Sequence, residues 1–109
     1  MTERDLTKIV LDAARAFGWK SMHIRPARTK DGWRTPIQGS GVGWPDVVLF
    51  REEHMIAAEL KVGQNRLTYE QELWLSAIQK VETVRAYTWR EMDIDRIILT
   101  LKEAPCSQK

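Results

Sequence analysis

The segment 43–61 constrains the fold more than any other part of the chain, because it predicts two apolar strands joined by a short polar turn. The first strand follows Pro45 and ends at Phe50, and the second runs over residues 56–61. Residues 51–54 between them are all polar or charged. Apolar side chains occupy both faces of the two strands, which is typical of the centre of a sheet that is covered on both sides.

Three charged residues interrupt these strands, namely Asp46, Glu59 and Lys61. If the turn is centred between Glu52 and Glu53, Asp46 lies directly opposite Glu59, with Cβ atoms roughly 4.5–5.5 Å apart on one face. Lys61 shares this face, because side chains alternate along a strand. A slip of one residue would place Asp46 on the other face. In the favoured register, two carboxylates and an amine converge.

A close carboxylate pair indicates a cation, because the two charges repel unless a proton or a metal ion lies between them. A hard divalent cation prefers such oxygen ligands. The carbonyl of Leu60 points away from the Glu59 side chain and reaches the cation only if the strand twists or bulges. Such a set suits phosphodiester hydrolysis, with a lysine to position water or offset negative charge. The simpler alternative is a solvated strand face, which the apolar flank 56–58 disfavours.

Length and composition predict one globular domain over residues 1–109, with a frayed tail at 103–109. The 109 residues carry a formal net charge of +2 and a single cysteine, Cys106, which excludes a disulfide or a multi-cysteine zinc site within one chain. No apolar run approaches the roughly 18 residues of a membrane span, and the N-terminal residues lack a secretory signal. We therefore expect a cytoplasmic protein without membrane association.

Patterns outside the hairpin predict the order αβββαβα, an α/β fold with a mixed sheet. Because a strand, a helix and a strand follow one another over 55–89, the two strands are expected to be parallel. Residues 26–43 have no periodicity and predict a long loop. The expected elements are a helix over 3–17 capped by Thr2, a strand around 22–24, a helix from the Thr68 cap to about 80, a strand over 84–89 and a helix over 92–101.

Basic residues gather in and before this loop and predict a nucleic-acid contact. They are Lys20, Arg25, Arg28, Lys30 and Arg34, with Arg66 further along the chain. A basic run is more often only a solvated loop, but beside a site for phosphodiester chemistry we expect these side chains to neutralise DNA phosphates. His23 and His54 are isolated in the sequence and give no indication of a metal site.

The two-part motif resembles the PD-(D/E)xK nucleases, and among them the virus-type replication–repair nuclease domain, VRR-NUC. The resemblance covers almost the whole chain, and its motifs are Gly43-Trp44-Pro45-Asp46-Val47-Val48-Leu49-Phe50, Glu59-Leu60-Lys61, Gly63 and Leu67-Thr68-Tyr69-Glu70-Gln71. It implies a restriction-endonuclease-like αβββαβ core, a mixed central sheet flanked by helices, with a C-terminal helix after it.

The resemblance also implies a metal site. Asp46 and Glu59 would bind Mg²⁺ or Mn²⁺ with the Leu60 carbonyl, and Lys61 would be the catalytic lysine. The family places an acidic residue in the first helix, often as E-x-x-x-Q; Glu3 matches the glutamate, whereas Thr7 replaces the glutamine.

Gln71 has two open interpretations. In the family the equivalent residue lines the site, whereas a capping box needs Gln71 only at the third helical position after Thr68.

The resulting expectation is a metal-dependent DNA endonuclease of phage or bacterial replication and repair, selective for Holliday-junction-like or flap-like DNA. Stand-alone viral members of the family resemble Holliday-junction resolvases and tend to dimerise, so a homodimer is expected. One alternative is a non-catalytic nucleic-acid-binding module on the same fold. Another is a small assembly protein without a nucleic-acid role.

Overall fold

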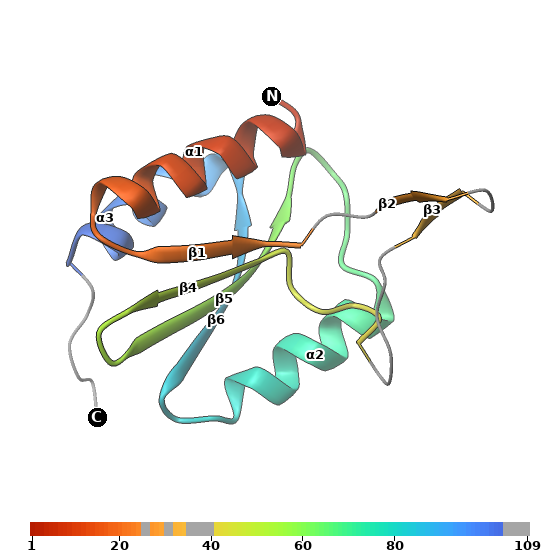
Figure 1. Ribbon diagram of the computed structural model, residues 1–109. Helices are drawn as coiled ribbons and strands as arrows, with labels where there is room; N and C mark the ends of the chain where they lie inside the picture. Colours follow the sequence, from red (N-terminus) through yellow and green to blue (C-terminus); the bar gives the residue numbers. More distant parts are fainter. Residues whose placement is uncertain (25–26, 30–31, 35–40, 104–109) are drawn as a thin grey trace.

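Four strands form a mixed open sheet in the order β1-β4-β5-β6, with three helices on its two faces (Figure 1). The computed structural model describes residues 1–24 and 41–103, and the backbone of 27–29 and 32–34. The strands are β1 (Lys20–His23), β4 (Val47–Arg51), β5 (His54–Lys61) and β6 (Val84–Arg90). Neighbours are antiparallel except for β5 and β6, which are parallel. This confirms the α/β class, the mixed sheet and the central position of the hairpin.

The hairpin of β4 and β5 has the register that the sequence predicts. Val47 pairs with Ala58 and Arg51 pairs with His54, so the turn consists of Glu52 and Glu53. A two-residue hairpin turn needs a left-handed backbone conformation, and Glu52 has a φ of 55°. Continued by one residue, this register places Asp46 opposite Glu59.

Helix α1 (Glu3–Ala16) packs one face of the sheet. Thr2 and Asp5 form a capping box at its start, and Phe17 is its C-cap, so the predicted helix over 3–17 is confirmed. Gly18 follows with a φ of 85°, a conformation that glycine adopts without strain. The helix buries residues spaced four apart, which are Leu6, Val10 and Ala14.

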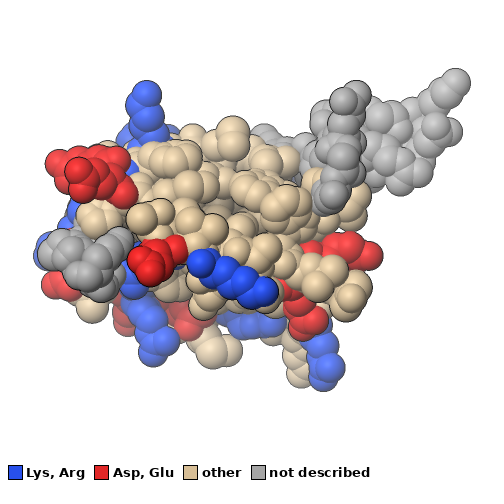
Figure 2. Space-filling view, turned by 90° about the horizontal axis from the view of Figure 1, so that it is seen from below, with Lys and Arg blue, Asp and Glu red and all other residues tan. Residues whose placement is uncertain are grey.

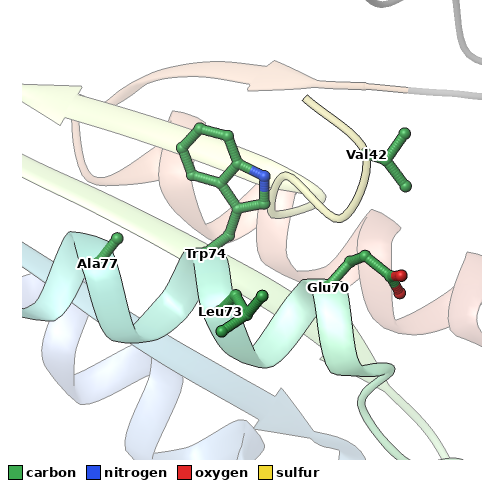
Figure 3. A pocket seen from close by; sticks show the side chains of 5 residues that line it. All are labelled: Val42, Glu70, Leu73, Trp74 and Ala77. Atoms are coloured by element: carbon green, nitrogen blue, oxygen red, sulfur yellow. The ribbon is translucent and has the colours of Figure 1, made fainter. Parts of the chain in front are cut away.

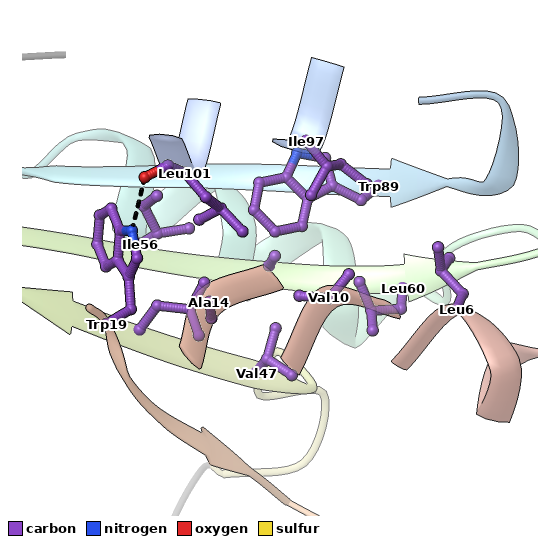
Figure 4. Close-up of a cluster of buried hydrophobic side chains, with 12 residues drawn as sticks. Leu6, Val10, Ala14, Trp19, Val47, Ile56, Leu60, Trp89, Ile97 and Leu101 are labelled. Carbon is purple, nitrogen blue, oxygen red and sulfur yellow. Dashed lines mark hydrogen bonds between the residues drawn. The ribbon is translucent and has the colours of Figure 1, made fainter. Parts of the chain in front are cut away.

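The main core lies between the sheet and the layer formed by α1 and α3 (Ile94–Glu103), which contact each other (Figure 4). Its other members come from alternate positions of the central strands and from β6 and α3. They are Trp19, Val47, Leu49, Ile56, Ala58, Leu60, Trp89, Ile97 and Leu101. The odd residues of β4 and the even residues of β5 therefore face this layer, and Asp46, Glu59 and Lys61 face the opposite side.

One end of the core is fastened by side chains that reach helix carbonyls. The indole Nε1 of Trp19 donates to the carbonyl of Leu101 at 2.9 Å (Figure 4). Arg51, at the end of β4, donates from Nη1 to the carbonyls of Phe17 at 2.8 Å and Leu101 at 3.0 Å. Its guanidinium also lies 5.0 Å from the centre of the Trp19 ring. These contacts join the C-terminal ends of α1 and α3 to the hairpin.

Helix α2 (Tyr69–Gln79) covers the other face of the sheet and begins at the predicted capping box of Thr68 and Gln71. The turn before β4 lies directly against it. Gly43 has a φ of 93°, and a Cβ atom there would fall 2.6 Å from the backbone carbon of Glu70. The rings of Trp44 and Trp74 meet edge to face, 4.9 Å apart.

Three expected boundaries differ from the structure. The first strand spans residues 20–23 rather than 22–24. The last helix starts later than Met92, because Glu91–Asp93 forms a 3₁₀ turn in which the Asp93 carboxylate accepts from the Arg90 backbone nitrogen at 2.9 Å. Helix α3 then continues to Glu103, so the expected fraying does not begin there. The rest of the expected tail, 104–109, lies outside the described residues.

The expectation of a featureless loop over 26–43 is wrong in part. Strands β2 (Ala27–Thr29) and β3 (Gly32–Arg34) form a separate antiparallel pair, which Figure 1 shows projecting from the main sheet. Three-residue strands are too short to produce a recognisable alternation of apolar and polar residues. Among the described helices, none is long and apolar enough to span a membrane.

Candidate active site at the ends of strands β4 and β5

Asp46 is held in place by both neighbouring strands. Its backbone carbonyl accepts from the Ile24 nitrogen at 3.0 Å, and its carboxylate Oδ2 accepts from the Leu60 nitrogen at 2.9 Å. The preceding Pro45 is fully buried, and Gly43 lies against α2. The sequence Gly-x-Pro-Asp therefore positions the site: its glycine lets the chain pass close to the start of α2, and the Asp46 carboxylate is held against β5.

Glu59 is the buried acid of this site, with only 2% of its surface exposed. Its Oε2 atom accepts from Nε2 of Gln71 at 2.7 Å and lies 4.0 Å from Nζ of Lys61. Its Oε1 atom is buried and has no hydrogen-bond partner among the described residues. A buried carboxylate oxygen without a hydrogen-bond donor carries a desolvation cost. The Nη1 atom of Arg85 is the other buried side-chain atom without a hydrogen-bond partner among the described residues.

The two carboxylates perturb each other. Burial, followed by the negative charge of Asp46, raises the pKa of Glu59 to about 8, although the Lys61 ammonium opposes the shift. Burial also raises the pKa of Asp46, while the hydrogen bond from the Leu60 nitrogen acts in the opposite direction. Near neutral pH the pair therefore favours either a bound proton or a nearby cation.

Gln71 makes both a capping contact and a contact with Glu59. Its Oε1 atom accepts from the Thr68 nitrogen at 2.8 Å, which is the capping-box bond. Its Nε2 atom donates to Glu59. One side-chain amide thus starts α2 and orients the buried acid, because a cap uses only the carbonyl half of the amide.

Glu3 approaches the site from the first turn of α1. Its negative charge contributes to the raised pKa of Asp46, and its Oε2 atom accepts from Nδ2 of Asn65 at 3.3 Å. The hydroxyl of Thr7 donates to the carbonyl of Glu3 within the helix, at 2.8 Å. Glu3, Thr7 and Asp46 line one hollow of about 710 Å³.

Two residues near the site have no motif that marks them in the sequence. His23 lines the same hollow, and its electrostatic interaction with Asp46 opposes the rise in the pKa of that carboxyl. It arrives there because β1 pairs His23 with Val47, the neighbour of Asp46. Asn65 arrives through the turn after β5. The pairing of β1 with β4 is the only signal that would have identified His23.

The predicted DNA-contact residues are spread over the molecule. Lys20 pairs with Phe50, so it lies at the end of β1 away from Asp46, and it is exposed. Arg66 is exposed next to Asn65, at the site end. Arg28 and Arg34 lie in the projecting pair of strands, whereas Arg25 and Lys30 lie outside the described residues. Of this described set, Arg66 is the one that directly follows Asn65, whose amide contacts Glu3.

The carboxylates of Asp46 and Glu59 are oxygen ligands of the kind that a hard divalent cation prefers. Within the part of the chain that the structure describes, no group of three or more histidine, cysteine, aspartate or glutamate side chains could hold a metal ion alone. Two carboxylates would therefore need a backbone carbonyl and water as further ligands, which is common for Mg²⁺. The partnerless Oε1 atom of Glu59 is the specific observation that favours a cation here. The Leu60 carbonyl as a ligand stays a prediction.

Comparison with known proteins adds no family assignment. No protein-family model matches the chain, and no curated protein matches it. The likeness to VRR-NUC domains therefore rests on the motif residues and stays a prediction.

Proposed function

We propose that this chain is a divalent-metal-dependent DNA endonuclease with the restriction-endonuclease-like core of the VRR-NUC nucleases. The observation that carries the proposal is the buried Glu59 carboxylate, whose Oε1 atom has no partner among the described residues and whose other oxygen faces Lys61 at 4.0 Å. An acid in this setting is costly for a purely structural protein. A bound cation would offset the desolvation cost of this carboxylate, and a phosphodiester substrate would give the cation a function.

The described side chains have distinct roles in this proposal. Asp46 and Glu59, with the Leu60 carbonyl, would hold Mg²⁺ or Mn²⁺, and Glu3 would join from α1. A metal bound there supplies Lewis acidity toward a phosphoryl oxygen and a water of lowered pKa. Lys61 offsets the negative charge that develops on the phosphate. Gln71 keeps Glu59 in one orientation through its 2.7 Å hydrogen bond.

The proposed substrate is DNA, in branched form such as a Holliday junction or a flap, within phage or bacterial replication and repair. The basic side chains Lys20, Arg25, Arg28, Lys30, Arg34 and Arg66 would contact phosphates. Because one such site cuts one strand, a homodimer would allow two strands to be cut together. The structure-selectivity and the dimer both follow from the family resemblance.

The test is a cleavage panel on four-way, flapped, nicked and plain duplex DNA, with Mg²⁺, Mn²⁺ or a chelator. We expect cleavage only with a divalent metal, and a loss of at least about 100-fold in Asp46→Asn, Glu59→Gln and Lys61→Ala. Lys102→Ala and Asp95→Asn, on α3, are matched controls that should retain activity.

Two outcomes would contradict the proposal. Equal cleavage by the three site variants would exclude this site as the catalytic centre. If the wild-type chain cleaves none of the DNA forms but binds them in a salt-dependent and metal-independent manner, the chain is a nucleic-acid-binding module instead.

A further inference from the structure

Helix α2 exposes an apolar surface on the side away from the sheet. Only Ile78 of this helix is buried, whereas Tyr69 is 70% exposed and Leu73 is 51% exposed. Val81, just after the helix, is 48% exposed, and Val42 in the turn beside it is 65% exposed. Single exposed apolar residues are ordinary, but Val42 and Leu73 line one hollow together, and grouped apolar side chains are typical of an interaction surface.

The stripe along this surface is self-complementary. Glu70, Leu73, Ala77 and Lys80 follow one another at spacings of three, four and three residues, so they lie along one face of the helix. All four are exposed. The stripe has an acid at its N-terminal end, a base at its C-terminal end and two apolar residues between them. When a second copy is laid antiparallel, each Glu70 meets a Lys80 and each Leu73 meets an Ala77.

Much of this side is uncharged. Figure 2, which views the molecule from below relative to Figure 1, shows large uncharged areas together with acidic and basic groups that lie next to one another. A symmetric pair of copies can bury the uncharged part and oppose the charged ends, whereas parallel alignment would bring like charges together.

A shallow hollow beside the stripe offers a place for a protruding side chain. It measures about 440 Å³ and is lined by Val42, Glu70, Leu73, Trp74 and Ala77 (Figure 3). In Figure 3, Trp74 turns toward the turn before β4, while Leu73 projects from the helix surface next to the hollow. Ala77 keeps the surface low on that side because its side chain is small.

We infer that the exposed face of α2 binds the same face of a second copy of this chain, with the two helices antiparallel about a two-fold axis. Leu73 of each copy enters the hollow of the other beside Ala77, and Glu70 of each copy pairs with Lys80 of the other. The inference deepens the proposed function, from which it takes the expectation of a homodimer, by naming the surface that forms it.

The expected complex is weak and depends on concentration. Helix α2 has 11 residues, which makes it roughly 16 Å long, so the pair buries less than the roughly 1,200 Å² of a standard stable interface. The ion pairs between Glu70 of one copy and Lys80 of the other are exposed and therefore screened by salt. Association should therefore weaken moderately as salt rises, while the apolar contacts persist.

Sedimentation velocity over a concentration series is the direct measurement. We expect the average mass of the wild-type chain to rise from that of one chain toward that of two. Leu73→Lys should raise the dissociation constant at least about 10-fold, because it places two cations in apolar hollows. Glu72→Lys, an exposed charge on the same helix but outside the stripe, is the matched control and should change it less than about 2-fold.

A charge exchange tests the antiparallel arrangement. Glu70→Lys and Lys80→Glu should each weaken association about 3-fold or more, and the double variant should return close to the wild-type value. A wild-type chain that stays single at all concentrations, an unaffected Leu73→Lys variant, or a double variant no better than the single ones would each overturn the inference.

Two readouts separate this inference from the proposed function. Thermal unfolding followed by circular dichroism verifies that each variant is folded, which the exposure of its side chains leads us to expect. The Lys61→Ala protein should associate like the wild type, because Lys61 is not on the exposed face of α2. Association without any cleavage would therefore overturn the proposed function alone, and cleavage by a chain that stays single would overturn the interface alone.

Discussion

The two ends of the central hairpin differ in how their charged side chains find partners. At the turn end, the Arg51 guanidinium has two carbonyl acceptors and an aromatic ring. At the open end, Glu59 is almost fully buried, and its Oε1 atom has no partner within the described residues. Arg51 is half-buried and has partners, whereas Glu59 is buried, so the two ends differ in how far the protein alone offsets the cost of desolvation. This difference is the reason for proposing a cation at the open end.

The largest effect on stability is expected when the Arg51 guanidinium at the turn end is removed. Arg51→Ala should lower the free energy of unfolding by about 3 kcal/mol, because it removes two charged hydrogen bonds and a cation–π contact. Urea unfolding measures the loss, with Arg66→Ala as the control at an exposed position. Cleavage per folded molecule should not change. A variant within about 0.5 kcal/mol of wild type would contradict an anchoring role for this end.

The open end depends on a close approach of backbone to backbone. Gly43→Ala places a methyl group 2.6 Å from the backbone carbon of Glu70, at a φ of 93°, so we expect a loss of about 2 kcal/mol. The same change displaces the chain three residues before Asp46, and cleavage should fall as well. Gly63→Ala is the matched control, because its φ is also positive but nothing lies within 4 Å of the added carbon. Equal losses in the two variants would assign the effect to backbone strain alone.

The unsatisfied end also predicts how stability depends on pH in metal-free protein. The folded-state pKa of Glu59 is about 8 against an ordinary value of 4.5, so between these values the folded chain binds more protons than the unfolded chain. The free energy of unfolding should therefore fall as the pH rises from about 5 to about 8. Denaturation of wild type and Glu59→Gln at several pH values measures it.

Glu59→Gln should remove most of that slope, because glutamine does not titrate. Mg²⁺ or Mn²⁺ at pH 8 should restore stability to the wild type and not to the variant. A wild-type chain whose stability rises over this pH range would show that the acid pair is satisfied without a cation.

The smallest expected effect separates the two bonds of Gln71. Gln71→Ala loses the cap and the contact to Glu59 and should cost about 1 kcal/mol. Gln71→Glu keeps a capping carboxylate at the third helical position but sets a second negative charge against Glu59. Both variants should lose cleavage, and thermal unfolding should show the smaller loss for the glutamate variant at low pH. Full cleavage by Gln71→Ala would limit this residue to the cap.

The open end was largely predictable because its determinants are local. The polar turn at 51–54 sets the register, and the apolar neighbours of Glu59 indicate that it is buried. The Thr68–Gln71 cap is visible as a four-residue pattern. These signals require no knowledge of distant contacts, so the sequence predicts the pairing of Asp46 with Glu59.

The contacts at the turn end of the hairpin and the residues that flank the site were not predictable in the same way. Arg51 appears in the sequence as one of four polar turn residues, yet its acceptors lie 34 and 50 positions away. His23 reaches the site only through the pairing of β1 with β4, and Asn65 only through its contact with α1. Long-range partners of this kind depend on tertiary packing, which periodicity and local motifs do not encode.

The contact of Gly43 with Glu70 has a mechanical consequence. Helix α2 presents its exposed stripe to solvent, Gln71 to Glu59 and the backbone of Glu70 to the turn that leads into Asp46. Any displacement of its first turn therefore moves both carboxylates at once, from two directions. A force on the exposed face of α2 would therefore change the distance between the Asp46 and Glu59 carboxylates.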